Sequence, residues 1–354
     1  MSVSRSRGLK FDVGSSRLSF LTSSLPHIFT SRARILAVLL LMILAAAIAP
    51  AAGAQALPSQ VLSLYPPETG ELVFVDLRAL RGTRHYSQVK SQVLPERYRQ
   101  LEQFAAILGI NFETAVHQMS WGFVGVPDTQ SAEFAGVAEG VFSLADVRRR
   151  ARQNGLGASE VEGQLAVSMG KNSAGQEFLF AFPDASRIVF GFRGVVEGML
   201  GRFARSGPSL TNNAAVNALI SEVNGRAPLW LVTDKRYTVF AIKQLLPEAQ
   251  NLPGFEDLSG RLESAVIRFD LRDGLRTQAA VSCQNASDAM LLSTILQGAI
   301  TYQAFRVNES NPEMARLLRE TSVTRREQRI EVGMNVADGD LVALLQKNAL
   351  QLNF

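Results

Sequence analysis

The feature that most constrains this fold is a pair of short segments on either side of a tight turn. Residues 262–271 and 275–283 alternate apolar and polar side chains, and Asp273-Gly274 stands between them. This dipeptide is typical of two-residue hairpin turns, which join antiparallel strands. Similar strand-sized segments recur along the chain with helical segments between them. The sequence therefore predicts an α+β fold, in which antiparallel sheets carry helices packed on one face.

The remaining elements follow from the spacing of apolar residues and from turn or cap residues. Further strands are predicted at residues 71–76, 121–126, 133–142, 161–168, 177–182, 187–192, 229–233 and 321–334. Helices are predicted at residues 84–108, 144–154, 195–205, 213–223 and 286–305, at Pro312 behind the N-cap Asn311, and at Leu341 behind Asp338 or Asp340. A turn at Pro183-Asp184 is predicted to join two of these strands.

Two parts of the chain share a faint pattern. At a constant offset of 142 residues, the strand and helix that begin at Arg187 align with those that begin at Arg329. At the same offset Asp146 aligns with Asp288. These matches indicate either a duplication or two similar α+β patterns. The domain prediction is a leader at 1–54, a linker at 55–70, and two related lobes at 71–255 and 260–354.

The N-terminal segment has the layout of a secretory signal. Arg32 and Arg34 precede an uncharged run at residues 35–49, which Pro50 and the small-residue site Ala52-Gly53-Ala54 follow. We expect cleavage near Gln55 and a periplasmic or secreted mature protein. The alternative is a membrane anchor formed by residues 35–54 that faces outside the cytoplasm.

The leader also accounts for the basic charge of the chain. The whole sequence has 36 basic and 32 acidic residues, and the first 54 residues hold six and one of these, which leaves 30 and 31. A balance near −1 does not predict a nucleic-acid partner. Cys283 is the one cysteine, so no intrachain disulfide can form, and its apolar strand predicts a buried structural thiol.

Catalytic motifs are weak in this sequence. Ser87 and Lys90 match an S-x-x-K spacing without its partner motifs, and the histidines His27, His85 and His117 lack ligand spacing. No metal site, cofactor or catalytic residue is predicted. Four glycines lie at the end of the strand predicted at 187–192 and in the turn and helix that follow it. They predict close helix packing rather than a phosphate-binding loop. They are Gly191, Gly194, Gly198 and Gly201.

Two groups of charged residues are weak candidates for a binding role. Asp76, Arg78 and Arg81 follow the first predicted strand and are the first-ranked ligand-binding candidates, although a helix N-cap with solvated arginines explains them without a function. The densest basic cluster is predicted to be a solvated helix surface, with an acidic partner as the alternative. Its members are Arg148, Arg149, Arg150 and Arg152.

The segment from Tyr65 to Leu80, YPPETGELVFVDLRAL, opens with prolines, a threonine, a short apolar strand and Asp-Leu. In this it resembles uncharacterised exported bacterial proteins, and the segment from Gly207 to Asn213 is similar to that group as well. The resemblance implies an exported domain and supplies no catalytic residues.

These observations favour a non-catalytic binding or scaffolding protein of the periplasm or cell envelope. Its expected partner is an envelope protein or an apolar, lipidic ligand, with membrane contact only through an uncleaved N-terminal segment. The alternatives are an envelope hydrolase whose site is assembled only by the fold, and an accessory subunit of an envelope complex. Facing carboxylates in a cleft would favour the hydrolase, and an exposed apolar patch would favour a partner protein.

Overall fold

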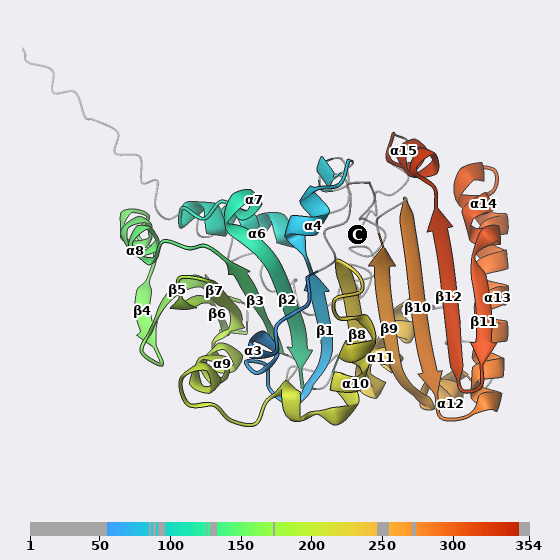
Figure 1. Ribbon diagram of the computed structural model, residues 1–354, viewed down its shortest axis with the longest axis horizontal. Helices are drawn as coiled ribbons and strands as arrows, with labels where there is room; N and C mark the ends of the chain where they lie inside the picture. Colours follow the sequence, from blue (N-terminus) through green and yellow to red (C-terminus); the bar gives the residue numbers. More distant parts are fainter. Residues whose placement is uncertain are drawn as a thin grey trace, which may run out of the picture.

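The computed structural model describes residues 55–84, 86–87, 90, 96–125, 127, 133–172, 174–245, 255–270 and 274–346. Its centre is one sheet of twelve strands in the order β11-β12-β10-β9-β8-β1-β2-β3-β7-β6-β5-β4, and each pair of neighbours is antiparallel (Figure 1). The strands are β1 (Thr69–Val75), β2 (Val116–Val124), β3 (Glu133–Gly140), β4 (Ala158–Val161), β5 (Gln164–Lys171), β6 (Glu177–Asp184), β7 (Arg187–Phe192), β8 (Leu229–Asp234), β9 (Leu262–Asp270), β10 (Leu275–Cys283), β11 (Ser322–Arg326) and β12 (Arg329–Val336).

Helices lie on both sides of this sheet. They are α3 (Ser59–Leu62), α4 (Leu77–Arg81), α6 (Glu96–Ile107), α7 (Phe112–Ala115), α8 (Leu144–Gln153), α9 (Arg193–Arg205), α10 (Ala214–Val223), α11 (Lys235–Leu245), α12 (Phe255–Ser259), α13 (Ala286–Val307), α14 (Pro312–Glu320) and α15 (Asp338–Gln346). The predicted α+β class with antiparallel strands is confirmed. The helices, however, pack on two faces of the sheet and not on one.

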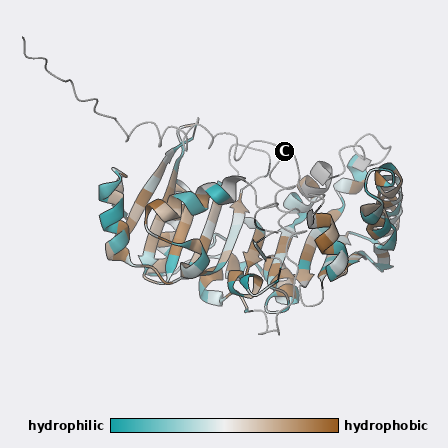
Figure 2. Ribbon diagram, turned by 90° about the horizontal axis from the view of Figure 1, so that it is seen from above, coloured by the Kyte–Doolittle hydropathy of each residue, from teal (hydrophilic) through white to brown (hydrophobic). Residues whose placement is uncertain are grey.

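Strand alternation assigns each core to a face. On β1, Val73 and Val75 pack in one apolar cluster, whereas Leu72 and Phe74 pack in another. We call the first side the A face; it is covered by α4, α6, α8, α14 and α15, with α12 and α13 over a smaller cluster that includes Cys283 and Ile330. We call the other side the B face; it is covered by α3, α9 and α10. Figure 2 shows how strongly hydrophobic residues concentrate in the strands between these helices.

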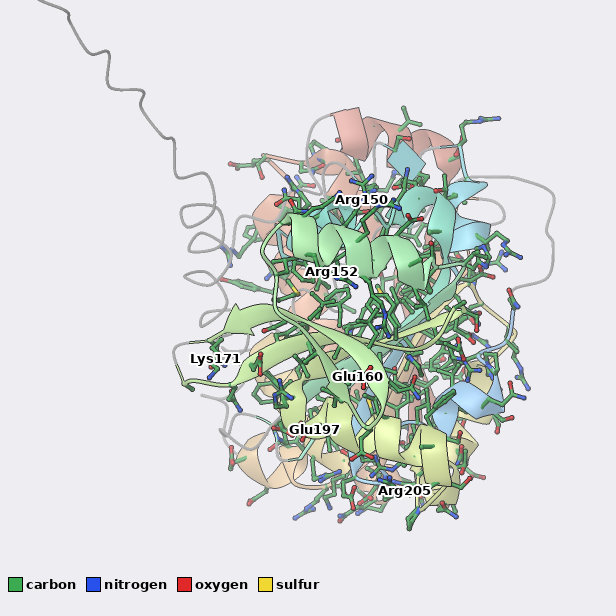
Figure 3. The ribbon with its side chains drawn as sticks, turned by 90° about the vertical axis from the view of Figure 1, so that its left-hand side faces the viewer. Arg150, Arg152, Glu160, Lys171, Glu197 and Arg205 are labelled. Atoms are coloured by element: carbon green, nitrogen blue, oxygen red, sulfur yellow. The ribbon has the colours of Figure 1, made fainter. Side chains whose placement is uncertain are left out.

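At the β4 end of the sheet, one helix is seen on each face. Figure 3 looks onto this edge, with α8 and its labelled Arg150 and Arg152 on one side and α9 with Arg205 on the other. The strand predicted at 161–168 is in fact part of a hairpin of β4 and β5 that turns at Glu162-Gly163, where both residues have positive φ. Glycine suits such a turn because it lacks a Cβ.

The turn predicted at Pro183-Asp184 was wrong by two residues. Both residues belong to β6, and the turn lies at Ala185-Ser186. The Asp184 carboxylate accepts hydrogen bonds from the Ser186 amide (2.7 Å) and hydroxyl (2.6 Å). An aspartate that closes the following turn in this way competes with proline as a turn signal.

The sheet continues through the predicted lobe boundary. Residues 255–260 fall between β8 and β9, which are adjacent strands with Leu231 opposite Ile267. The two predicted lobes therefore share one sheet, and their division stays a prediction. Strand order does show two similar halves, β1-β2-β3-β7-β6 and β8-β9-β10-β12-β11, which meet where Val73 of β1 pairs with Leu231 of β8.

The proposed offset of 142 fits these halves only partly. It aligns the N-caps of α8 and α13, where Ser143 and Asn285 each accept a hydrogen bond from the amide three residues on. It aligns β3 with β10, but the aligned residues lie on opposite faces of the sheet. Ala135 packs on the B face, while Thr277, at this offset, shares the A face with Leu275. The final helices also differ, because α9 covers the B face and α15 the A face. The duplication stays a hypothesis.

Candidate functional site

The B face changes character at β9. On β1 and β8 its side chains are buried and apolar, as with Phe74 and Trp230 under the B-face helices. On β9, β10, β12 and β11 they are mostly polar, and in the part of the chain that the structure describes no helix lies in front of β10 and β12 (Figure 1). An antiparallel sheet with one packed and one open face alternates apolar and polar residues. The sequence of β10 has this alternation.

Strand register arranges the polar side chains in rows. One row holds Arg268, Gln278, Gly333 and Ser322 on successive strands. The next row holds Val266, Ala280, Glu331 and Thr324. Residues directly opposite on neighbouring strands lie about 5 Å apart, so each row is a continuous strip of side chains across the sheet.

A groove with a volume of about 310 Å³ lies where these rows meet the C-terminal end of α10. Its floor is low because Gly333, Ala280 and Val266 carry small side chains or none; a Cβ at Gly333 would lie 2.8 Å from the Ser322 hydroxyl oxygen. We call it the arginine groove. It is lined by Glu222, Val223, Arg226, Val266, Arg268, Gln278, Ala279, Ala280, Ser322, Thr324, Arg329, Glu331, Val332 and Gly333.

One ion pair forms the wall between α10 and β12. Arg329 donates to both carboxylate oxygens of Glu222, at 3.2 and 2.6 Å. This charged partner raises the pKa of Arg329 against the opposing effect of burial. Because the pair is bidentate, it fixes the guanidinium plane at the groove.

The other arginines of the groove and its rim make fewer or longer contacts with carboxylates. Arg268 donates from Nε to the side-chain oxygen of Gln278 at 2.7 Å. Arg226 is exposed and has no ion-pair partner among the described residues. At the rim, Arg276 contacts Asn335 and Arg326 approaches Glu331 at 3.6 Å.

The electrostatic balance of this surface is positive. The residues that line the groove carry three guanidinium groups, those of Arg226, Arg268 and Arg329, against the two carboxylates Glu222 and Glu331. Guanidinium groups beside hydroxyl and amide groups suit carboxylate or phosphate groups on a polar ligand. Each carboxylate of the groove faces an arginine, Glu222 at Arg329 and Glu331 at Arg326, and this arrangement suits binding more than general acid–base chemistry.

The candidates predicted from sequence lie elsewhere, around the start of α4 on the A face. Asp76 caps this helix, with its carboxylate accepting from the amides of Ala79 (2.9 Å) and Gln55 (3.1 Å). Arg81 donates to the backbone carbonyls of Phe112 and Val116, at 2.8 and 2.5 Å. These bonds are structural.

Arg78 is the exposed member of that group. With Arg81 it contributes to the lowered pKa of His117, although burial is the largest cause. A ligand role for Asp76, Arg78 and Arg81 stays a prediction, and the fold does not bring them to the arginine groove. No signal in the sequence pointed to the groove, because its arginines come from three separate elements.

The weak catalytic motif has a structural explanation. Lys90 forms ion pairs with Glu102 (2.7 Å) and Glu113. Burial lowers the pKa of Lys90, but the hydrogen bonds to these two carboxylates outweigh it, and the net pKa is raised. A general base needs a lowered lysine pKa, so this lysine is poorly suited to activate Ser87.

The remaining residue types of interest do not assemble a reactive site in the described part of the chain. Cys283 is buried, and its burial, together with Asp288, raises the thiol pKa to about 11. His27 and His85 lie outside the described residues, and no group of three potential metal ligands occurs among those described. The described helices include none that is long and apolar enough to cross a membrane.

The α8 arginines and the α9 glycines can also be placed. Arg148, Arg149, Arg150 and Arg152 are exposed, as predicted for a solvated surface. The close helix packing predicted from the glycines of α9 is not observed at Gly198 and Gly201. A Cβ at either position would face a guanidinium group of the same helix, that of Arg202 or Arg205, one turn further along.

Comparisons with known proteins add little. No protein-family profile and no curated protein matches this chain. Among solved structures, a crystal form of TP0453 matches 85% of this chain and 100% of its own, with 10% sequence identity and a TM-score of 0.45. A likeness of this size does not assign a family, a ligand or a location.

Proposed function

We propose that this chain is a non-catalytic binding protein that acts outside the cytoplasm and holds an anionic ligand in the arginine groove. The observation that carries the proposal is the convergence of Arg226, Arg268 and Arg329 on one groove whose floor is kept low by small residues. The layout of the first 54 residues supports the location. This ligand class differs from the apolar ligand expected from the sequence.

The spacing of the arginines favours a ligand with more than one acidic group. Arg268 and Arg329 lie two strands apart, and register places Arg329 opposite Ser282, four residues along β10 from Gln278. With about 4.8 Å between strands and about 3.3 Å per residue, their backbones are roughly 16 Å apart. An extended polyanion can contact both guanidinium groups without drawing the two side chains together. We therefore propose an elongated ligand that bears several carboxylates or phosphates.

Isothermal titration calorimetry with two probes tests this function. Inorganic tripolyphosphate and a galacturonate oligomer supply phosphates and carboxylates, and a neutral maltooligosaccharide is the control ligand. We expect the acidic probes to bind with an affinity that falls as salt rises, because exposed ion pairs are screened. The pair of substitutions Arg226→Ala and Arg268→Ala should reduce binding about tenfold or more.

The matched control is the pair Arg148→Ala and Arg152→Ala on α8, which removes the same charge from an exposed surface far along the sheet. If both pairs weaken binding equally, the effect is one of net charge and the groove is not the site. Absence of binding by either acidic probe at low salt would reject the proposed ligand class.

A further inference from the structure

Helix α13 exposes most of the large apolar side chains found at the surface. Of the five exposed large hydrophobic residues in the described part of the chain, four belong to this helix: Met290 (56% exposed), Leu291 (46%), Tyr302 (60%) and Phe305 (79%). No charged residue occurs between Asp288 and Arg306. The helix is 22 residues long, about 33 Å at 1.5 Å per residue. An apolar surface of this length on a helix marks a contact site.

The exposed residues form a regular stripe. At 100° per residue, Leu291, Tyr302 and Phe305 lie within about 40° of Gly298 around the helix axis and Met290 lies about 80° away, whereas the buried Ala289, Leu292 and Ala304 face the sheet or α14. The spacing along the stripe is 3, 4, 3 and 4 residues, which is the spacing of a helix–helix contact seam. We call it the Gly298 seam. It consists of Leu291, Thr294, Gly298, Thr301 and Phe305, flanked by Tyr302.

Gly298 has no explanation within this chain. Glycine in the interior of a helix lowers its stability relative to alanine. A Cβ at this position would have no described atom within 4 Å, so packing inside the chain does not require its absence. A residue without a side chain at the middle of an exposed apolar stripe does allow another helix to approach closely.

We propose that α13 pairs antiparallel with α13 of a second copy of this chain, with the two Gly298 residues facing each other. This inference is independent of the arginine groove, which lies on the other face of the sheet. Its basis is the symmetry of the seam. Leu291 and Phe305 each stand seven residues from Gly298, so a two-fold axis places one against the other. The same axis places Thr294 opposite Tyr302 and opposes the two helix dipoles.

A groove beside the seam receives a side chain in this arrangement. It has a volume of about 410 Å³ and lies between α13, α14 and β11, with Ile300, Ala304, Leu318 and Val323 among its lining residues. The two-fold axis brings Met290 of the second copy, eight residues before Gly298, to the level of Arg306, one residue beyond the groove-lining Phe305, on the side where this groove opens. Methionine is flexible and fits irregular apolar spaces.

Charge supports a second copy as the occupant. Arg306, whose guanidinium lies 5.9 Å from the centre of the Tyr302 ring, falls opposite Met290 of the other copy and not opposite another arginine. The pairing therefore opposes no like charges along the seam.

The oligomeric state of the full chain, expressed with its own N-terminal segment and measured by sedimentation velocity over a range of concentrations, tests the pairing. We expect a monomer–dimer equilibrium. Leu291→Glu and Phe305→Glu should each weaken the dimer about tenfold or more. Val141→Glu replaces another exposed apolar residue, 70% exposed and outside α13, and should leave the equilibrium unchanged.

Gly298→Ala distinguishes an effect on the dimer from an effect on the stability of the monomer. The substitution should raise the melting temperature of the monomer, because alanine favours the helix, and weaken the dimer, because the methyl group separates the two helices. In a Cys283→Ala background, Gly298→Cys should form an intermolecular disulfide on mild oxidation, and Gln303→Cys, off the seam, should not. A monomer at every concentration, or equal cross-linking at both positions, would overturn the proposal, as would a dimer that Leu291→Glu and Phe305→Glu leave intact.

Discussion

Arg329 on β12 and Glu222 on α10 form a bidentate ion pair between residues 107 positions apart in the sequence. The pair lies where the covered part of the B face ends and its open, polar part begins. Both side chains are about a third exposed, so water screens the interaction and its contribution to the free energy of unfolding should be small, about 0–1 kcal/mol. Its larger consequence is that Glu222 occupies the guanidinium that an anionic ligand would use.

The first prediction concerns this competition. Glu222→Gln should raise the affinity for tripolyphosphate roughly five-fold, because it releases Arg329, and Arg329→Gln should lower it. Titration calorimetry at constant ionic strength measures both. Glu320→Gln, which removes a carboxylate paired with Arg316 on α14, controls for net charge. Equal gains from Glu222→Gln and Glu320→Gln would show that Arg329 is not a ligand contact.

A second prediction concerns the crowded A face at Gly136. A Cβ there would press against the ring of Phe190 and lie 2.7 Å from the Ser120 carbonyl oxygen. Gly136→Ala should therefore lower the free energy of unfolding by about 1–3 kcal/mol, as overpacked cores do. Urea denaturation measures the change. Gly157→Ala is the matched control, since its Cβ would have no atom within 4 Å and the expected change is within about 0.5 kcal/mol. Similar losses in the two variants would contradict the overpacking argument.

Local sequence signals predicted most individual elements. The alternation around Asp273-Gly274 gave the β9–β10 hairpin, and Asn311-Pro312 gave the start of α14, where Asn311 accepts from the Met314 amide at 3.1 Å. Both depend on residues close together in the chain. The helix α11 was missed, since it follows β8 without an intervening breaker and its Thr-Val-Phe run favours a strand as much as a helix.

The single sheet and the groove depend instead on distant pairings. Val73 lies opposite Leu231 because β1 and β8 are neighbours, and alternation alone does not say which strand edges meet. Nothing in its own segment marks Arg268 or Arg329 as part of a binding site. Only the register across β9, β10 and β12 brings them to one groove.

The third prediction concerns the thiol. Cys283 is 2% exposed, and its raised pKa, about 11, keeps it protonated at neutral pH. A thiol reagent should therefore label the native protein slowly and the unfolded protein rapidly, because the thiolate is the reactive form. Cys283→Ala should cost on the order of 1 kcal/mol and leave ligand binding unchanged. Rapid labelling of the folded chain would indicate a reactive role.

The last prediction concerns pH and Glu139, at the end of β3. Burial raises the pKa of this carboxyl above the usual 4.5; the hydrogen bond from Gln118 and the charge of Arg187 only partly offset the shift. Glu139 has a higher pKa in the folded chain than in the unfolded chain. In the pH interval between these two pKa values, the folded chain binds the proton more tightly than the unfolded chain. Stability from this group is therefore lost as the pH rises through that interval.

Glu139→Gln cannot titrate at this position, so it isolates the effect. Relative to wild type, the variant should gain stability as the pH rises above about 4, measured by urea denaturation at each pH. Glu160→Gln, on the exposed edge strand β4 (Figure 3), controls for the loss of a carboxylate and should show no such gain. A constant difference between Glu139→Gln and wild type, or one that falls as the pH rises, would mean that burial does not favour the protonated form of Glu139.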